Sequence, residues 1–365
     1  MKILIGVCGI GNGHLGRQTN VIELLLKNHH EIVIATTKNN ISYFKNKFPK
    51  FKTVEIIIPW ISCNSTGIDF VTSLKKYEKE NMDYFSKFLN FSIQLEKSFT
   101  GIPDLVITDY EPNVAQYSYA LNIPLICMEQ QSKFLYLNEI EISKYSILEE
   151  KRRINYFFPK YEYKVLSSFF PIVIKDKRVK VVSPIIFPLD KLKNKKNHIL
   201  VYFSPYENSY KYKKILKALE NISNFKVIVY TKEKFSVKSN NIVFKSYSSD
   251  FKDDLENSFF LISTAGHQLL GESISLEIPV YLIPLSTYEQ NYNAKMIEKY
   301  ELGEIGNSMT NKEITSFIKN IPYYNKKIIQ FKKKYYKNSW EKKFMQIINK
   351  LEIKVKGEFK LFIKK

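Results

Sequence analysis

Residues 263–272 read Ser263-Thr264-Ala265-Gly266-His267-Gln268-Leu269-Leu270-Gly271-Glu272, and they lie between two apolar runs, residues 259–262 and 279–284. This order predicts a strand, a glycine turn, a helix and a second strand. Such a turn presents free backbone N–H groups and the positive end of a helix, which together bind a diphosphate. Glu272 lies about two turns into that helix, where it is placed to accept hydrogen bonds from both hydroxyls of a ribose.

Two further polar residues, Glu289 and Gln290, follow the second of these strands. In a parallel sheet the carboxyl end of a strand opens on the same crevice as the neighbouring turn. A diphosphate turn with acceptors on both sides predicts a nucleotide-sugar site.

This order resembles the donor signature of GT-B glycosyltransferases, the group that contains plant and macrolide UDP-sugar transferases and the lipid I N-acetylglucosaminyltransferase. In much of that group the turn reads His-x-Gly, with a Glu further along the helix and an acid-Gln pair beyond it. Here Thr264 stands in place of the His, as a neutral donor that makes a weaker hydrogen bond. The resemblance implies that the donor is bound by Ser204, Thr264, Gly266, His267, Glu272, Glu289 and Gln290.

The length and the pattern of apolar runs predict two α/β domains. At 365 residues, with an apolar fraction of 44%, the chain exceeds what one core usually supports. Strand-like and helix-like runs alternate, which predicts parallel sheets covered by helices. The segment before residue 179, rich in Tyr, Phe and Lys, is expected to be irregular. We predict two Rossmann-like domains facing across a cleft: an acceptor domain at 1–190, a donor domain at 191–338, and a helix with a basic tail at 339–365 that crosses back, as the resemblance implies.

The loop Gly11-Asn12-Gly13-His14-Leu15-Gly16 follows the first predicted strand and matches the dinucleotide pattern G-x-G-x-x-G. A dinucleotide site needs an acid about twenty residues on, and the second strand ends Thr36-Thr37-Lys38 without one. The other interpretation is that Gly11 and Gly13 let the backbone approach the acceptor or a phosphate. His14 then faces the cleft, where a neutral imidazole is suited to take the proton of an acceptor hydroxyl.

Two acidic residues follow strands of the same half. A carboxylate that binds the second ring nitrogen orients a histidine base, and Asp109 ends a strand that opens on the same cleft, so we predict it as the partner of His14. Met128-Glu129-Gln130-Gln131 resembles the His-Glu-Gln-Asn loop of the lipid I transferase. That resemblance implies that Glu129 contacts the acceptor or serves as an alternative base.

The positive charge is concentrated at the C-terminal end. The formal net charge is +20, and residues 311–365 contain 16 lysines and 4 glutamates. We predict a lipid-linked or glycan acceptor and peripheral contact with an anionic membrane. No common nucleic-acid motif is found, so no nucleic-acid partner is expected. Unpaired cysteines, no signal cleavage site and no long apolar run predict a cytoplasmic protein at the inner face of the membrane.

The predicted activity is transfer of a hexose or N-acetylhexosamine from a nucleotide diphosphate sugar, UDP by family frequency, to an acceptor hydroxyl with inversion. No metal-ligand spacing is visible, so we expect no cofactor and a metal-independent reaction. Two alternatives stay open. A UDP-N-acetylglucosamine 2-epimerase has the same fold and similar ribose contacts, and a non-catalytic binder of anionic lipid or nucleic acid would have inherited the fold without the reaction.

Overall fold

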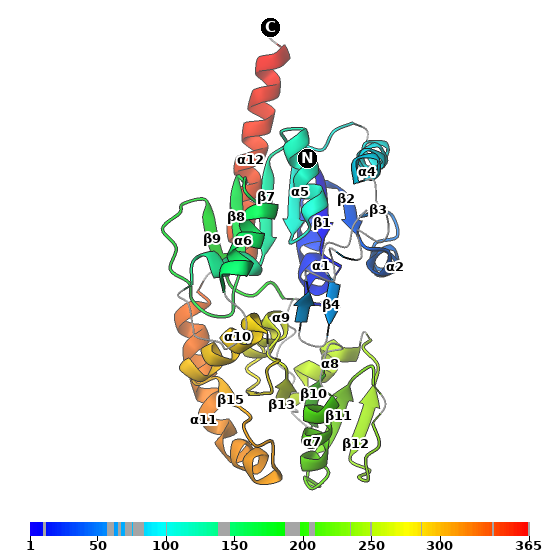
Figure 1. Cartoon of the computed structure of the whole chain (residues 1–365). Coiled ribbons are helices and arrows are strands. Elements are labelled where there is room, and N and C mark those ends of the chain that lie inside the picture. The colour runs from blue at the N-terminus through cyan, green and yellow to red at the C-terminus, as the bar shows by residue number, and fades with distance from the viewer. Residues whose placement is uncertain are drawn as a thin grey trace.

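The chain is described here from a computed structural model, which covers residues 1–9, 12–56, 62–64, 67–69, 75, 84–99, 101–137, 147–186, 198–203, 209–233, 235–248, 250–285, 287–337 and 339–363. Two parallel β-sheets form the centres of two domains stacked end to end (Figure 1). The predicted α/β fold with two Rossmann-like domains is confirmed.

The first domain holds a sheet of seven strands in the order β3-β2-β1-β6-β7-β8-β9. Its strands are β1 Lys2–Val7, β2 Glu31–Thr36, β3 Lys52–Glu55, β6 Leu105–Asp109, β7 Leu125–Glu129, β8 Tyr163–Ser167 and β9 Val179–Val182. The direction of strand addition reverses between β1 and β6, so a crevice opens at the carboxyl ends of this pair.

Strand β8 corrects our expectation of an irregular segment before residue 179. Four of its five residues are buried, because β8 lies between β7 and β9 inside the sheet. Buried parallel strands carry short continuous apolar runs, which are hard to recognise where aromatic residues and lysines surround them.

Helices cover both faces of the first sheet. They are α1 Asn12–Lys27, α2 Lys38–Lys47, α4 Tyr84–Ser98, α5 Pro112–Ala120 and α6 Ile147–Phe157, with a 3-10 turn η1 Gln131–Leu135 and a small hairpin of β4 Ser62–Asn64 and β5 Gly67–Asp69. Along β1, Ile3 and Ile5 pack in one cluster with α1 and α2, while Leu4 packs in another with α4, α5 and α6. This alternation follows from the two-residue period of a strand.

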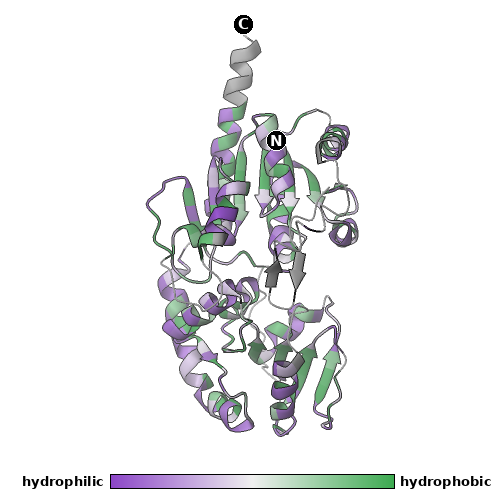
Figure 2. Ribbon diagram, in the orientation of Figure 1, coloured by the Kyte–Doolittle hydropathy of each residue, from purple (hydrophilic) through white to green (hydrophobic). Residues whose placement is uncertain are grey.

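The second domain repeats the plan with six parallel strands in the order β12-β11-β10-β13-β14-β15. They are β10 His198–Tyr202, β11 Lys226–Tyr230, β12 Ile242–Lys245, β13 Ser258–Ser263, β14 Val280–Leu282 and β15 Gly303–Ile305. The helices are α7 Ser209–Leu219, α8 Asp250–Glu256, α9 His267–Ser275, α10 Tyr288–Lys299 and α11 Asn311–Tyr335. The strands are largely apolar, whereas the helices carry both polar and apolar residues (Figure 2).

The last helix, α12 Trp340–Ile363, returns to the first domain. Trp340, Phe344 and Ile348 belong to the same core cluster as Val165 of β8 and Val182 of β9. The predicted crossing helix is therefore confirmed, and its backbone continues beyond the body of the first domain (Figure 1). The predicted domain boundary at 190/191 lies outside the described residues.

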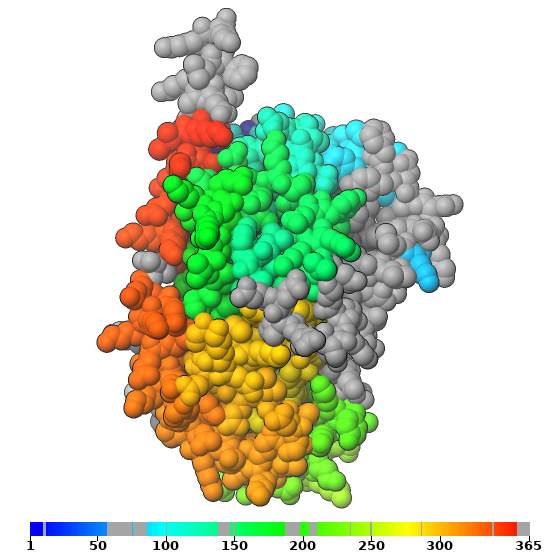
Figure 3. Space-filling model, turned by 60° about the vertical axis from the view of Figure 1, so that its left-hand side comes forward, coloured from blue at the N-terminus to red at the C-terminus, as the bar shows by residue number. Residues whose placement is uncertain are grey.

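The domains meet through an aromatic contact. The ring of Phe134 lies 5.5 Å from that of Tyr288 and 6.1 Å from that of Tyr292, and the two domains touch directly on this face (Figure 3). A Cβ placed on Gly271 of α9 would lie 2.8 Å from the Cβ of Pro184. The absence of a side chain at Gly271 thus allows α9 to pack closely against the first domain.

Candidate functional site

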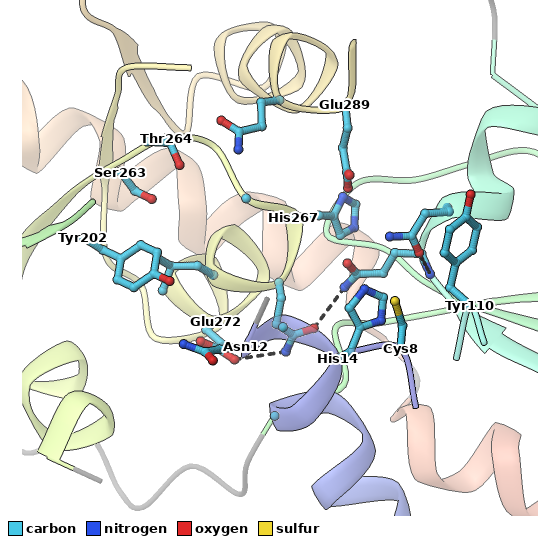
Figure 4. Close-up of a pocket in the computed structure, with 18 of the residues that line it drawn as sticks. Cys8, Asn12, His14, Tyr110, Tyr202, Ser263, Thr264, His267, Glu272 and Glu289 are labelled. Atoms are coloured by element: carbon cyan, nitrogen blue, oxygen red, sulfur yellow. Dashed lines mark hydrogen bonds between the residues drawn. The ribbon is translucent and has the colours of Figure 1, made fainter. Parts of the chain in front are cut away.

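A cavity of about 280 Å³ lies between the domains. Most of the predicted site residues are among those that line it: Gly13, His14, Thr264, Gly266, His267, Glu272, Glu289 and Gln290 (Figure 4). Residues that are far apart in the sequence come together here because the carboxyl ends of both sheets open on one cleft.

His14 and Asp109 form a buried pair at the wall of this cavity. His14 Nδ1 lies 2.8 Å from Asp109 Oδ1, since α1 follows β1 and Asp109 ends the adjacent strand β6. Burial raises the pKa of Asp109, but the charges of Arg17 and His14 outweigh it and lower that pKa to about 2. The carboxylate is therefore ionised, as an orienting partner of a histidine base must be.

The sequence analysis did not predict two further hydrogen-bond donors to Asp109, which are Arg17 and Gln18. Arg17 Nε donates to Asp109 Oδ2 at 3.0 Å and Arg17 Nη2 donates to Oδ1 at 2.6 Å. Gln18 Nε2 donates to Oδ2 at 2.9 Å. The spacing in the sequence could have predicted these contacts, because residues three and four places after His14 lie on the same face of α1. Arg17 is 1% exposed, so its charge neutralises Asp109 inside the protein.

The turn before α9 has its left-handed residue at Ala265 and not at Gly266. Ala265 has a φ of 71°, whereas Gly266 has a φ of −63°. Asn293 Nδ2 donates to the carbonyl oxygen of Ala265 at 2.9 Å and stabilises this geometry. A Cβ on Gly266 would meet no heavy atom within 4 Å. Gly266 therefore does not need to be a glycine for its backbone conformation. Its missing side chain leaves open space at the cavity.

His267 begins α9 and is largely occupied by protein contacts. Its Nδ1 lies 3.1 Å from Asn293 Oδ1, and its ring centroid lies 4.7 Å from that of Phe169. Burial, together with the charge of Lys133, lowers the pKa of His267 well below its ordinary value. A neutral imidazole at this position packs against the first domain while its edge reaches the cavity.

Glu272 and Thr264 both line the cavity, Glu272 from the second turn of α9 and Thr264 from the turn that precedes the helix (Figure 4). Gln268 Nε2 donates to Glu272 Oε1 at 3.0 Å. Burial raises the pKa of Glu272 to about 7, against the lowering effects of that hydrogen bond and of Arg17. The carboxylate is thus poised between its protonated and ionised forms near neutral pH.

Glu289 and Gln290 lie in the first turn of α10 rather than at the strand end. Thr287 is the N-cap of that helix, and its side chain accepts from Gln290 N. Gln290 Oε1 accepts from Leu285 N at 3.0 Å, and Lys133 Nζ donates to Glu289 Oε1 at 3.2 Å. Lys133 belongs to the first domain, so this ion pair is a second contact across the cleft.

Glu129, which we predicted as an acceptor contact, is not brought to the cavity. Glu129 is fully buried, its Oε2 accepts from Ser132 N at 2.9 Å, and it is not among the lining residues. This arrangement gives Glu129 the role of an anchor for η1 and does not support an acceptor contact. Gly11 and Ser204 lie outside the described residues.

An aromatic wall that we did not predict forms part of the cavity lining. Tyr202, Tyr247 and Phe251 all line it, and the centroid of Phe251 lies 5.1 Å from Tyr247 and 5.6 Å from Tyr202. Aromatic residues make up 15% of the chain, so an aromatic residue at or near the end of a strand did not by itself predict a place in the cavity.

The described residues contain no group of three or more His, Cys, Asp or Glu side chains arranged to bind a metal ion. Within the same part of the chain, none of the helices combines the length and apolarity of a membrane span.

Comparison with known proteins agrees with this geometry. The model of glycosyl transferase family 1 matches residues 1–322. The chain belongs to glycosyl transferase family 1. This result confirms the resemblance drawn from the donor stretch, identifies the protein as a glycosyltransferase and favours that class over the epimerase. A search of curated proteins found no match.

Solved glycosyltransferase structures share the fold of this family 1 member. Arabidopsis thaliana UGT89C1 complexed with quercetin superposes with a TM-score of 0.71 at 12% identity, covering 96% of this chain and 99% of that one. The calicheamicin glycosyltransferase CalG4 gives 0.67 at 12% identity, covering 97% and 99%. Spinosyn forosaminyltransferase SpnP gives 0.66 at 12%, covering 97% and 99%. At such identities the likeness establishes the GT-B fold alone.

Proposed function

We propose that this glycosyltransferase moves a hexose or N-acetylhexosamine from a UDP-sugar to a hydroxyl of a lipid-linked or polysaccharide acceptor, with inversion. The observation that carries the proposal is the His14–Asp109 pair, 2.8 Å apart, on the same cavity as the Gly266 turn and Glu272. A base and a nucleotide subsite in one cavity are what direct sugar transfer requires.

The donor subsite is assigned to the second domain. The diphosphate binds at the backbone N–H groups of Gly266 and the start of α9, with Thr264 as a side-chain donor. Glu272 accepts from the ribose hydroxyls, and the uracil packs on the wall of Tyr202 and Tyr247. UGT89C1 has been solved complexed with UDP-L-rhamnose, at 14% identity and a TM-score of 0.69, which supports a UDP-sugar as donor.

The transfer step is assigned to His14. The imidazole removes the proton of the acceptor hydroxyl as that oxygen attacks the anomeric carbon, and the bond from that carbon to the diphosphate oxygen breaks with its electron pair on the diphosphate. Attack from the face opposite the leaving group inverts the anomeric centre. Asp109 stabilises the imidazolium that forms. The helix end at α9 stabilises the leaving diphosphate, so we propose a reaction without a metal or cofactor.

The acceptor is assigned from charge. Lysines recur every seven residues along α11, at Lys312, Lys319, Lys326 and Lys333, and all four are exposed. Because seven residues are close to two helical turns, these lysines form one basic stripe about 30 Å long. Such a stripe attracts an anionic membrane surface, where lipid-linked acceptors reside. We propose that the enzyme acts at the cytoplasmic face of that membrane.

The test is incubation of the full chain with a panel of nucleotide sugars, with and without a lipid or polysaccharide fraction, followed by mass spectrometry to detect sugar transfer and by NMR to detect a change of sugar configuration. Sugar transfer with release of UDP supports the proposal. An epimerised sugar nucleotide formed without acceptor refutes it, as does salt-sensitive lipid binding with no turnover of any donor.

A further inference from the structure

One side chain, Gln268 on α9, joins the two domains at the cavity. Its Oε1 accepts from Arg17 Nη1 at 3.3 Å and from Gln130 Nε2 at 3.0 Å, both in the first domain. Its Nε2 donates to the carbonyl oxygen of Ile185 at 2.9 Å and to Glu272 Oε1 at 3.0 Å. A side-chain amide has two donor hydrogens and two acceptor lone pairs, so every one of them is used here.

These partners fix the direction of the amide. Arginine only donates and an ionised carboxylate only accepts, so the carbonyl oxygen must face Arg17 and the nitrogen must face Glu272. The reversed amide would place its NH2 group against the guanidinium and its oxygen against the carboxylate. Because Gln268 is 8% exposed, water does not readily replace a lost contact.

The same network continues to the base. Arg17 binds both oxygens of Asp109, and Asp109 Oδ1 also contacts His14 Nδ1. Arg17 is 1% exposed and is not among the residues that line the cavity. Apart from the effect of its charge on Glu272, any effect of Arg17 on a ligand in the second domain must therefore pass through Gln268 or through residues that Arg17 itself positions.

We propose that Gln268 is a positioning residue that couples the donor subsite to the base: one amide holds Glu272 in place for the ribose and holds Arg17 on Asp109. The coupling requires the two domains to be in contact at Gln268, as they are in this structure, because Arg17 and Glu272 belong to different domains. This inference rests on the proposed function, since it takes Glu272 as the ribose contact. Coupling of this kind is reciprocal, so a change at Arg17, the residue that binds both Asp109 and Gln268, must alter nucleotide binding.

The experiment is a double-mutant cycle read out as UDP affinity by isothermal titration calorimetry on the full chain. Arg17→Lys keeps the positive charge beside Asp109 but replaces the guanidinium fork, so one group cannot bind Asp109 and Gln268 together. Gln268→Leu removes the amide at similar volume. Arg153→Lys is the matched control, because Arg153 donates to Glu150 at 2.7 Å and takes no part in this network.

We expect Arg17→Lys to weaken UDP binding by about 2- to 10-fold, the loss expected for one hydrogen bond. Gln268→Leu should weaken it at least as much, and the double variant should match Gln268→Leu within about twofold, because contacting residues are not additive. Arg153→Lys should leave the UDP affinity unchanged.

Two results would overturn the coupling but not the UDP donor. The first is that the wild type binds UDP and the Arg17→Lys variant binds it with the same affinity. The second is that the fold-losses in UDP affinity of the two single variants multiply in the double variant. A wild type that binds no UDP refutes the UDP donor, and the coupling with it. Melting curves check folding. If Gln268→Leu does not fold, Gln268→Glu replaces it, since that variant keeps the acceptors for Arg17 and Gln130 but cannot donate to Glu272; an unchanged UDP affinity there also refutes the proposal.

Discussion

Replacement of Gly266 by alanine should change stability and nucleotide affinity in opposite directions. The φ of −63° and ψ of 128° at Gly266 are accessible to any L-residue, and the added Cβ would meet no heavy atom within 4 Å. The substitution therefore introduces no strain and no clash. It also restricts the unfolded chain, which stabilises the folded protein by about 0.4–1 kcal/mol.

The same methyl group would occupy the space assigned to the diphosphate. A phosphate oxygen bound to backbone N–H groups lies about 2.9 Å from the nitrogen, and a methyl on the adjacent Cα prevents that approach. Loss of one charge-assisted hydrogen bond costs about 1.5–3 kcal/mol, which corresponds to a loss of roughly 10- to 100-fold in UDP affinity.

The assay pairs urea denaturation with calorimetric titration of UDP, and Gly16→Ala serves as the control. Gly16 also lines the cavity and a Cβ there also meets nothing within 4 Å, but its backbone lies inside α1, where the N–H is already bonded. Gly16→Ala should gain about 1 kcal/mol from helix propensity and keep its UDP affinity. A Gly266→Ala protein that binds UDP as tightly as wild type would show that the diphosphate does not lie at this turn.

Three further substitutions test other parts of the site. His14→Ala should lower the rate of transfer by about 10²- to 10⁴-fold while the UDP Kd stays within about twofold, and a near-normal kcat would remove His14 from the mechanism. Because burial raises the pKa of Glu272 to about 7, the carboxylate is ionised above that pH and protonated below it, so UDP affinity should fall as the pH drops through 7. Glu272→Gln should bind UDP more weakly by about 1–3 kcal/mol, and its UDP affinity should not change with pH in this way. Calorimetry between pH 6 and pH 8, about one unit on each side of neutral, measures both effects. An unchanged Kd would place the ribose elsewhere. Gly271→Ala would bring a Cβ to 2.8 Å from Pro184 and should destabilise the protein by about 1–3 kcal/mol in urea denaturation, where a neutral or stabilising effect would contradict the close packing of α9.

Much of the fold could be predicted from the sequence because buried parallel strands appear as short continuous apolar runs. The apolar runs 2–8, 31–36, 198–203 and 225–230 predict strands within one or two residues of the bounds of β1, β2, β10 and β11. Strand β15 was missed because three residues, Gly303–Ile305, are too few to show a period. Its pairing with β14 rather than its own sequence defines it.

The site was predicted less completely, and for a physical reason. His14 and Asp109 were paired because each follows a strand of one half, and strand ends converge. Gln268 and Arg17 meet only because two separate domains close on each other, and no local pattern encodes the relative position of two domains. The direction of the Glu129 side chain could not be predicted either, since a residue at a strand end points either into the crevice or into the core.

The charges around His14 point to an order of events. Asp109 and Arg17 neutralise each other at 2.6 Å, so the proton that His14 takes up during transfer adds one positive charge beside a pair of zero net charge. In a low dielectric an uncompensated charge is costly, and the nearest source of compensation in the proposed mechanism is the leaving diphosphate at the start of α9. Proton removal by His14 is then favoured only when the donor is in place, which predicts that the donor binds before the acceptor reacts. Product inhibition by UDP that is competitive with the donor and non-competitive with the acceptor would support this order, and the reverse pattern would refute it.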